Sequence, residues 1–167
     1  MLWPSVQDWV FALYVIAPIY CANGAPVIFG GGRPIDFGRT MTDGKRILGD
    51  HKTIRGLLSG LVVGVIVGAF ESLLAGSNMI VMATLAATGA LLGDLGGAFL
   101  KRRLGLEPGE PLLGVDQLDF VLGAVVAISF NFAPSLGTLL ILFCVTPPIH
   151  LLTNIGAYKL GLKSNYW

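Results

Sequence analysis

Residues 56–93 decide the fold class, because GLLSGLVVGVIVGAFESLLAGSNMIVMATLAATGALLG contains one charged residue, Glu71. A helix needs about 20 apolar residues to cross a bilayer, so this run is long enough for two crossings. Gly76-Ser77-Asn78 interrupts the run with turn-forming residues. The stretch therefore predicts two membrane-spanning helices joined by a tight turn, with Glu71 as an acid at the membrane interface near that turn.

Two further apolar runs extend this pattern outward. Residues 9–32 and 120–158 contain no Asp, Glu, Lys or Arg, and residues 131–137 break the longer run with turn-forming residues. The chain is 54% hydrophobic and 13% charged, whereas soluble domains carry about 25% charged residues. We therefore expect an all-α integral membrane protein, a single transmembrane domain over residues 1–167, with spans at 6–29, 56–75, 79–100, 118–134 and 137–158 and polar loops at 30–55 and 101–117.

The basic residues indicate the orientation of the protein. All eleven Lys and Arg residues lie in the two polar loops or after the last span, and none lies at the N-terminus or in either tight turn. Loops rich in Lys and Arg usually face the cytoplasm. We expect the N-terminus outside, and the polar loops, the C-terminus and the active site on the cytoplasmic side of the plasma membrane.

Three carboxylates near the second polar loop are candidate metal ligands. Asp94 precedes Lys101 by seven residues, which places it roughly 10 Å inside the membrane. A charge there costs on the order of 3 kcal/mol and usually faces a wet cavity or a partner. Asp116 and Asp119 share one face of the next helix, where capping of the helix N-terminus is the simpler interpretation. Because carboxylates and phosphate oxygens suit Mg²⁺, we favour a metal site at Asp94, Asp116 and Asp119.

Cations close to these acids predict phosphate binding. Lys101 and Arg102 follow the third span, and Lys52, Thr53 and Arg55 precede the second. Glycine-rich loops and the N-terminal ends of helices both favour anions. The alternative for the first loop is a polar connector that merely follows the positive-inside bias. Acids and cations together at the water-facing end of the spans predict phosphate chemistry at a membrane surface.

Other polar residues are less specific. Asn23 lies between Pro18 and Pro26 in the first span, and a polar amide between two kinks is a candidate contact for a ligand head group. His150 follows Pro147-Pro148, and we expect it to make a core hydrogen bond, with the alternative that it reaches the site from below. The acids of the first loop are candidates either for nucleotide contacts or for ordering the loop: Asp36, Asp43 and Asp50.

The acids and cations together resemble a known superfamily. The pattern Gly93-Asp94, Lys101-Arg102 and Asp116-x-x-Asp119 is similar to the C-terminal signature of the CTP-dependent phosphatidate cytidylyltransferases. Two departures concern the second loop. Residues 107–111 stand in place of the expected Pro-Gly-His-Gly-Gly, and Gln117 stands where the longer enzymes have Arg. These departures leave the roles of the second-loop residues open.

The chain as a whole resembles more closely the short archaeal branch of that superfamily, the CDP-archaeol synthases. This likeness covers nearly the full length and includes Pro18–Pro26, Arg33–Asp36 and Gly49–Gly56. It implies Mg²⁺-dependent transfer of CMP from CTP to a lipid phosphate, with release of pyrophosphate. For the archaeal branch, the acceptor is 2,3-bis-O-geranylgeranyl-sn-glycerol 1-phosphate and the product is CDP-archaeol, an intermediate of archaeal phospholipid biosynthesis.

The resemblance suggests a role for each group of residues. The three acids would hold Mg²⁺ and orient the CTP phosphates. Lys101 and Arg102 would neutralise the pyrophosphate or the lipid phosphate, and Lys52, Thr53 and Arg55 would close over the nucleotide. A phosphate oxygen is already ionised at neutral pH, so the reaction needs metal, cations and alignment but no activated Ser, Cys or His.

Other functions remain as alternatives. A CDP-diacylglycerol synthase acting on phosphatidic acid would recognise the same head group. A CDP-alcohol phosphotransferase needs Asp-Gly followed closely by Ala-Arg, whereas Asp43-Gly44 is followed by Lys-Arg. A transporter would use Asp94 at a site near the midplane and often shows inverted repeats, and we find no repeat in this sequence. We expect a lipid bilayer, CTP and a two-chain lipid phosphate as partners, and no nucleic acid.

Overall fold

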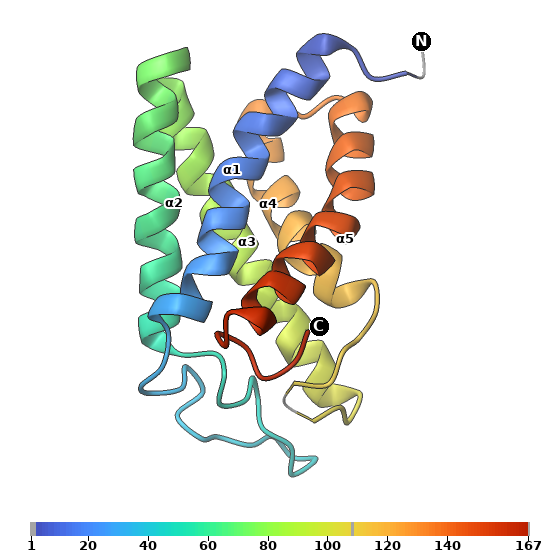
Figure 1. Ribbon diagram of the computed structural model, residues 1–167. Coiled ribbons are helices and arrows are strands. Elements are labelled where there is room, and N and C mark those ends of the chain that lie inside the picture. The colour runs from blue at the N-terminus through green and yellow to red at the C-terminus, as the bar shows by residue number, and fades with distance from the viewer. Residues whose placement is uncertain (1–2, 108, 167) are drawn as a thin grey trace.

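The computed structural model describes residues 3–107 and 109–166. This part of the chain contains five helices (Figure 1): α1 Val6–Phe29, α2 Ile54–Ala75, α3 Asn78–Arg103, α4 Val115–Phe132 and α5 Leu136–Lys159. All five are long and apolar enough to cross a membrane. The prediction of an all-α protein with five membrane-spanning helices is confirmed. Because α3 continues to Arg103, Lys101 and Arg102 lie in its last turn and not in the loop that follows.

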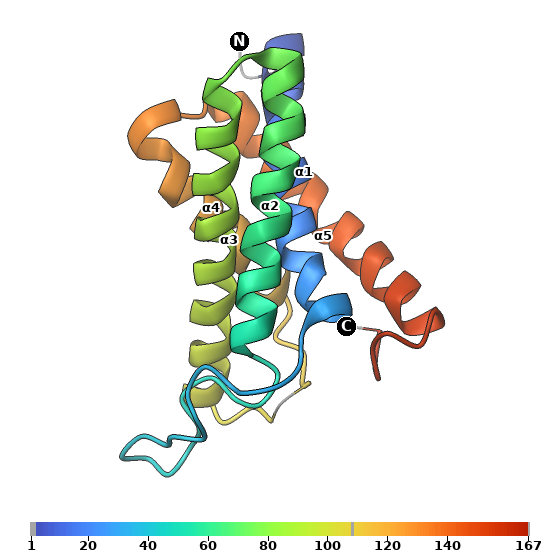
Figure 2. The same ribbon diagram turned by 90° about the vertical axis from the view of Figure 1, so that its left-hand side faces the viewer.

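Glycines bring α2 close to its neighbours α1 and α3 (Figure 2). Gly60, Gly64 and Gly68 recur every fourth residue on the buried face of α2. A Cβ atom on Gly60 would lie 2.6 Å from the carbonyl oxygen of Ala22 in α1, and one on Gly64 would lie 2.3 Å from the Cβ atom of Ala87 in α3. Small residues allow helix backbones to approach within a membrane, where packing drives helix association.

Glu71 lies on the same face of α2 as these glycines. Its exposed fraction is 7%, and its Oε2 atom has no hydrogen-bond partner among the residues that the structure describes. Glu71 therefore faces its neighbouring helices inside the bundle, and its position at the membrane interface stays a prediction. Glu71 follows Gly68 by three residues, and this helical spacing turns its side chain toward the contact with the neighbouring helices.

The helices α3 and α4 pack along a line of contacts that we call the glycine seam, formed by Gly89, Gly93 and Gly97 of α3 with Asp119 and Gly123 of α4. A Cβ atom on Gly93 would lie 2.1 Å from the backbone oxygen of Asp119. A Cβ atom on Gly97 would lie 1.9 Å from the carboxylate of the same residue. Only glycine leaves room for Asp119 here, so the seam fixes one of the predicted site residues against α3.

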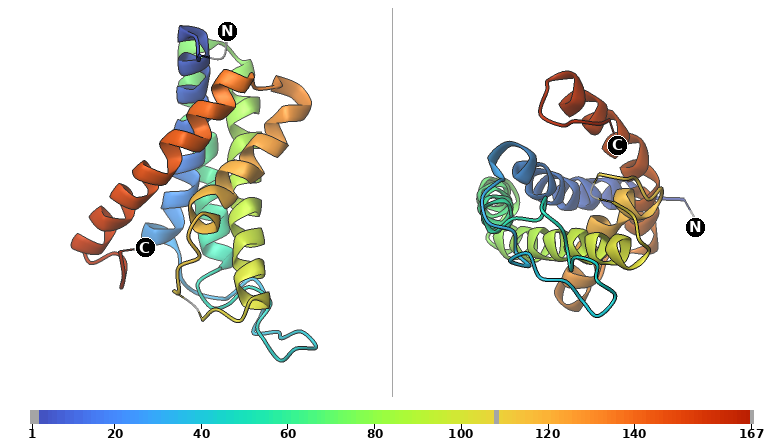
Figure 3. Two further views of the ribbon diagram at one scale, coloured as in Figure 1. Left: turned by 90° about the vertical axis from the view of Figure 1, so that its right-hand side faces the viewer. Right: turned by 90° about the horizontal axis from the view of Figure 1, so that it is seen from below.

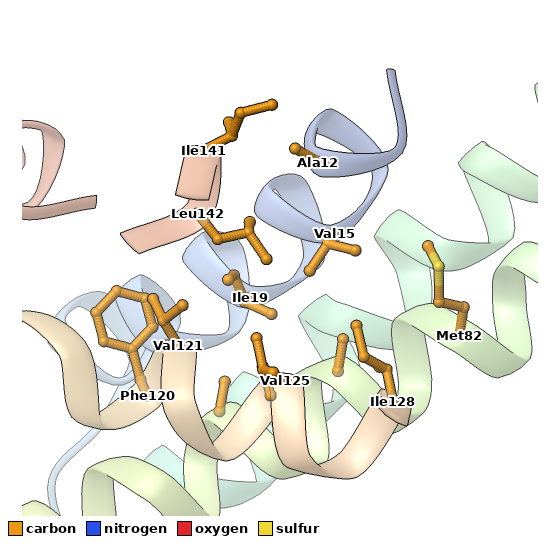
Figure 4. Packing of buried hydrophobic residues seen from close by; sticks show 13 residues of the cluster. Ala12, Val15, Ile19, Met82, Phe120, Val121, Val125, Ile128, Ile141 and Leu142 are labelled. Carbon is orange, nitrogen blue, oxygen red and sulfur yellow. The ribbon is translucent and has the colours of Figure 1, made fainter. Parts of the chain in front are cut away.

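Buried hydrophobic side chains fill the centre of the bundle between four of the helices (Figure 4). The cluster takes its residues from α1, α3, α4 and α5: Ala12, Val15, Ile19, Met82, Ala86, Ala90, Phe120, Val121, Ala124, Val125, Ile128, Ile141 and Leu142. The members from α5 come only from its first half. This half of α5 is therefore a part of the core.

The second half of α5 leaves the bundle (Figure 3). Pro147 and Pro148 lack the N–H groups that would bond to the preceding turn, and the hydroxyl of Thr146 donates to the carbonyl of Leu142 at 2.5 Å. No described residue of α5 beyond Thr146 is buried. The C-terminal part of α5 runs away from the other helices in both views of Figure 3.

Both polar loops and the segment after α5 lie at one end of the bundle, which we call the loop end (Figure 1). The first loop joins α1 to α2, and the second joins α3 to α4. Within the second loop, Pro108 belongs to the departure from the superfamily motif and lies outside the described residues. The loop end is the end at which the sequence predicts the functional site.

Asp36 organises the first loop. Its carboxylate accepts the backbone N–H groups of Gly38, Leu48 and Gly49 at 3.1, 2.9 and 3.0 Å, and it pairs with Arg46 at 2.6 Å. Burial alone would raise the pKa of Asp36, but the Arg46 guanidinium and the three backbone donors outweigh it and hold this pKa well below its usual range. A loop rich in glycine therefore has a defined shape.

The other two acids of the first loop also make ordering contacts. Asp43 pairs with Arg103 of α3 at 2.5 Å, and Arg103 donates a further hydrogen bond to the carbonyl of Arg46. Asp50 pairs with Arg46 at 2.6 Å. Of the two roles considered for these acids, loop ordering is the one that their contacts show.

Candidate active site

A cavity of about 900 Å³ opens at the loop end. All five helices, both loops and the segment after α5 contribute to its wall. Arg55 is exposed in the first turn of α2 and does not line the cavity. The structure brings together the other predicted site residues: Asn23, Lys52, Thr53, Asp94, Lys101, Arg102, Asp116 and Asp119.

Asp94 is paired with Lys52. The Nζ atom of Lys52 lies 2.6 Å from each oxygen of the carboxylate. Lys52 precedes Thr53, whose hydroxyl accepts the N–H of Gly56 at 3.1 Å and caps α2. This cap fixes the end of the first loop, so Lys52 reaches α3 from a defined position. An acid inside a membrane-spanning helix thus has the partner that its energetic cost requires.

Asp116 forms a second acid–lysine pair. The Nζ atom of Lys101 lies 2.9 and 2.8 Å from its two oxygens. The carboxylate also accepts the backbone N–H of Leu112 in the second loop at 2.9 Å. Asp116 therefore joins the last turn of α3 to the start of α4, and it does not act as a simple cap of its own helix.

The carboxylate of Asp119 accepts fewer hydrogen bonds from the described residues than those of Asp94 and Asp116 do. One oxygen accepts the backbone N–H of the next residue, Phe120, at 2.6 Å. The other oxygen faces Gly97 across the glycine seam and receives no hydrogen bond from the described part of the chain. Asp119 also lines the cavity, so this oxygen can accept from a ligand.

Arg102 is a buried cation in the same wall. Its exposed fraction is 7%, and its Nε atom has no hydrogen-bond partner within the described residues. A buried charge without a partner is costly, and an anion removes most of that cost. The position of Arg102 therefore favours a ligand that carries negative charge.

The donors in the cavity fit Mg²⁺ in kind, because three carboxylates supply hard oxygen ligands. However, no three Asp, Glu, His or Cys side chains in residues 3–107 and 109–166 stand close enough together to hold a metal ion. Lys52 instead forms an ion pair with Asp94, and Lys101 forms one with Asp116. The expected grouping of the three acids around one or two Mg²⁺ ions is not formed in this arrangement, and it requires both lysines to turn away.

Sequence reasoning missed one side of the cavity. His150, Asn154 and Lys163 line it from α5 and from the segment after this helix. The predicted hydrogen bond of His150 is formed, with Asn154 at 3.4 Å, but His150 is only partly buried and lines the cavity. Its ring packs against that of Phe120, with centroids 5.8 Å apart, and it faces the cavity. The signal in the sequence was the spacing of four between His150 and Asn154, which places both on one helix face.

Comparisons with known proteins identify the family and support the fold. The CarS-like family, described as CDP-archaeol synthase, matches residues 6–167. The CDP-archaeol synthase of Pyrococcus furiosus is 47% identical over 162 residues, which cover 93% of this chain and 96% of that protein. The CDP-archaeol synthase of Methanocaldococcus jannaschii is 39% identical over 170 residues, with 93% and 96% covered. The solved structure of an intramembrane enzyme for archaeal membrane lipids biosynthesis superposes with a TM-score of 0.82 at 40% identity, covering 87% of this chain and 94% of that one.

Fold, site and relatives together define a class of protein, a multi-pass membrane enzyme that transfers cytidylyl groups. The family match includes all five helices and the whole cavity wall. The chain belongs to the CDP-archaeol synthase family, which acts in archaeal lipid biosynthesis.

Proposed function

We propose that the chain catalyses Mg²⁺-dependent transfer of CMP from CTP to 2,3-bis-O-geranylgeranyl-sn-glycerol 1-phosphate, forming CDP-archaeol and pyrophosphate. The choice of an archaeal lipid rests on the relatives, which are CDP-archaeol synthases. The observation that carries the proposal is the cavity wall, where three carboxylates and three cations meet at the loop end of a membrane bundle: Asp94, Asp116, Asp119, Lys52, Lys101 and Arg102.

The reaction exchanges one phosphorus–oxygen bond for another. An oxygen of the lipid phosphate attacks the α-phosphorus of CTP. The bond from that phosphorus to the oxygen bridging to the β-phosphate breaks, and pyrophosphate leaves with the electron pair. Because the attacking oxygen is already ionised, no side chain has to remove a proton. The protein contributes alignment and charge compensation.

The acids and lysines of the cavity supply this compensation. Asp94, Asp116 and Asp119 would hold Mg²⁺, which when bound supplies positive charge to the phosphate oxygens. Lys52 and Lys101 lie on flexible side chains. Both turn from their carboxylates toward the phosphates when the nucleotide enters, so each cation keeps an anionic partner throughout. Asp119 is held against α3 by the glycine seam and needs no such movement.

Two further wall residues have proposed roles toward the substrates. Arg102 neutralises the triphosphate or the departing pyrophosphate, since it is buried and its Nε atom has no hydrogen-bond partner in the part of the chain that the structure describes. Asn23 offers its amide from α1 to the nucleotide or to the lipid head group. Arg55 stays a predicted contact whose exposed position outside the cavity requires the nucleotide to reach beyond the wall.

We place the loop end, and with it the active site, at the cytoplasmic face of the plasma membrane. All eleven Lys and Arg residues belong to the loops, helix ends and C-terminal segment on that side. CTP is available in the cytoplasm, and the lipid phosphate lies in the adjacent leaflet. The two substrates can therefore meet in the cavity without crossing the membrane.

The direct test is turnover by the purified protein in detergent. We would incubate it with CTP and Mg²⁺, and with either the isoprenoid-ether phosphate or phosphatidic acid, and measure pyrophosphate release and the mass of the lipid product. We expect pyrophosphate and CDP-archaeol with the ether lipid. Pyrophosphate with phosphatidic acid alone would indicate a CDP-diacylglycerol synthase. Consumption of a CDP-lipid with release of CMP would indicate a phosphotransferase, and no product in either assay would refute the proposal.

Substitution of the acids tests the metal assignment. Asp119→Asn and Asp94→Asn each remove a charged oxygen ligand, and we expect a loss of turnover of at least about 1,000-fold while the protein still inserts into the membrane. Asp43→Asn is the matched control, because Asp43 lies outside the cavity wall. Full activity in either cavity variant would remove the metal assignment.

A further inference from the structure

A second polar cluster lines the cavity, and the mechanism above does not use it. The Nδ2 atom of Asn154 lies 3.4 Å from Nδ1 of His150, and the Nζ atom of Lys163 donates to Oδ1 of Asn154 at 3.1 Å. All three side chains are partly buried. We call them the α5 cluster. They come from the second half of α5 and the segment after it, and not from the helices that carry the acids.

The α5 cluster is held in place from two sides. The ring of Phe120, which also contacts Tyr20 at a centroid distance of 5.5 Å, packs against His150. Phe120 directly follows Asp119, so the ring contact joins the cluster to the acid side of the same cavity. The Nδ2 atom of Asn165 donates to the carbonyl of Gly109 at 3.1 Å and ties the C-terminal segment to the second loop.

The chemistry of the α5 cluster differs from that of the acids. An ammonium group, an imidazole and an amide all offer N–H donors. Residues 136–166 contain no Asp or Glu, so the α5 cluster itself brings no carboxylate, and the acids of the cavity wall come from α3 and α4. Such a donor set suits the dianionic phosphate of a phosphomonoester.

The position of the α5 cluster indicates which phosphate it binds. Transfer between CTP and a lipid phosphate brings two phosphate-bearing substrates into one cavity. The acids with their paired lysines and Arg102 lie on the first loop, α3 and α4 and fit the metal-bound triphosphate. The cluster lies on the part of α5 that leaves the bundle (Figure 3), where no described residue after Thr146 is buried. A substrate that enters from the bilayer meets this part of the cavity.

We infer that His150, Asn154 and Lys163 form the subsite for the phosphomonoester group of the lipid acceptor. The inference rests on the proposed function. The subsite holds the acceptor phosphate with its attacking oxygen toward the α-phosphorus of the bound nucleotide. Pyrophosphate then departs on the side of Lys101 and Arg102. Separate donors for the two phosphates prevent the acceptor from taking the place of the triphosphate.

The test separates acceptor binding from nucleotide binding. Lys163→Met and His150→Gln should each raise the KM for the lipid phosphate about tenfold or more, because each removes a hydrogen bond to a charged group. The KM for CTP should change less than about twofold under the same reasoning. Lys159→Met is the matched control, since Lys159 is an exposed cation in the last turn of α5 and its loss changes the charge equally.

An equilibrium measurement supports the kinetic one. Calorimetry with a short-chain, water-soluble lipid phosphate should show weaker binding to Lys163→Met, while CTP with Mg²⁺ binds as in the wild type. Titration with glycerol 1-phosphate distinguishes recognition of the phosphate from recognition of the chains. If Lys163→Met binds both the short-chain lipid phosphate and glycerol 1-phosphate more weakly, the subsite is supported. If it binds only the short-chain lipid phosphate more weakly, the subsite assignment is overturned. Lys163→Arg should retain acceptor binding and shows that the segment is folded.

The outcomes also separate this inference from the proposed function. If the wild type releases no pyrophosphate with any lipid phosphate, the proposed function fails. If the wild type is active and Lys163→Met raises the KM for CTP and leaves that for the lipid unchanged, the proposed function stands and the subsite assignment is wrong.

Discussion

The glycine seam between α3 and α4 and the second half of α5 represent two kinds of packing around one cavity. At the seam, the carboxylate of Asp119 occupies space that a single methyl group on Gly97 would fill. The second half of α5 has no buried residue in the described chain and reaches the bundle through the ring contact between His150 and Phe120. One side of the cavity is therefore fixed by backbone contact, and the other by a few side chains.

This difference corresponds to the demands of the two substrates. A metal–triphosphate complex needs oxygen ligands at set positions, and rigid helices hold side chains to such positions better than loops do. A lipid acceptor has to enter from the bilayer, and a tightly packed helix would close that route. The helices α3 and α4 therefore fix the positions of the metal ligands, and α5 leaves a route for the lipid acceptor.

The largest effect is expected from a substitution at Gly97 that disrupts the glycine seam. In Gly97→Ala, the new methyl group pushes Asp119 away from α3, and we expect turnover to fall by at least about 100-fold, since small displacements at a reacting centre have effects of this size. Overpacking should also destabilise the protein by about 1–3 kcal/mol. Turnover and thermal unfolding in detergent measure the two effects.

The neighbouring glycine provides the control for this experiment. A Cβ atom on Gly96 would meet no heavy atom within 4 Å outside its own turn. Gly96→Ala should therefore keep its turnover within about twofold and gain slightly in helix propensity. If the two alanine variants lose activity equally, close contact at the seam is not what positions Asp119.

The sequence predicted the helices and the acids for a physical reason. Bilayer thickness sets the length of an apolar run, so all five spans matched helices that begin and end within a few residues of the expected positions. A charge inside such a run is costly, and for that reason Asp94 stood out. The three acids do line one cavity, as expected from their positions in the spans.

The sequence could not predict the pairing of side chains across helices. Lys52 and Asp94 are 42 residues apart, and their contact depends on how α2 and α3 pack. The environments of His150 and Glu71 could not be predicted for the same reason, because the direction in which a helix face points is set by its neighbours. Only the structure identified Asp119 as the group that lies against Gly97.

The second prediction concerns Lys52, which pairs with Asp94 of α3. Lys52→Met removes the counter-ion of Asp94, so free Mg²⁺ should bind more tightly in the absence of CTP, as measured by calorimetry. Turnover should fall about tenfold, because a charged contact to the phosphates is lost. Arg55→Met removes a charge three residues away but outside the cavity, and it should change metal binding little. Equal metal affinity in Lys52→Met and the wild type would show that Lys52 does not compete with the metal.

The smallest effect is expected in the first loop, which is attached to the rigid side through Asp43 and Arg103. Asp36→Asn should lower turnover about two- to threefold and lower the melting temperature by a few degrees, because a buried acceptor of several hydrogen bonds loses its charge. The pKa of Asp36 is lowered in the folded protein. Its stabilising contribution is therefore complete above the ordinary Asp pKa of about 4 and is lost as the pH falls below it.

The pH dependence provides the check on this loop. Thermal unfolding of the wild type and of Asp36→Asn should differ most near pH 7, and the two melting temperatures should converge as the pH falls below about 4. Asp50→Asn, which loses a single pairing with Arg46 at an exposed carboxylate, should show a smaller difference. A difference for Asp36→Asn that stays constant down to low pH would mean that the ionised carboxylate is not what orders the loop. The first loop would then be held by a few side-chain contacts, as the second half of α5 is.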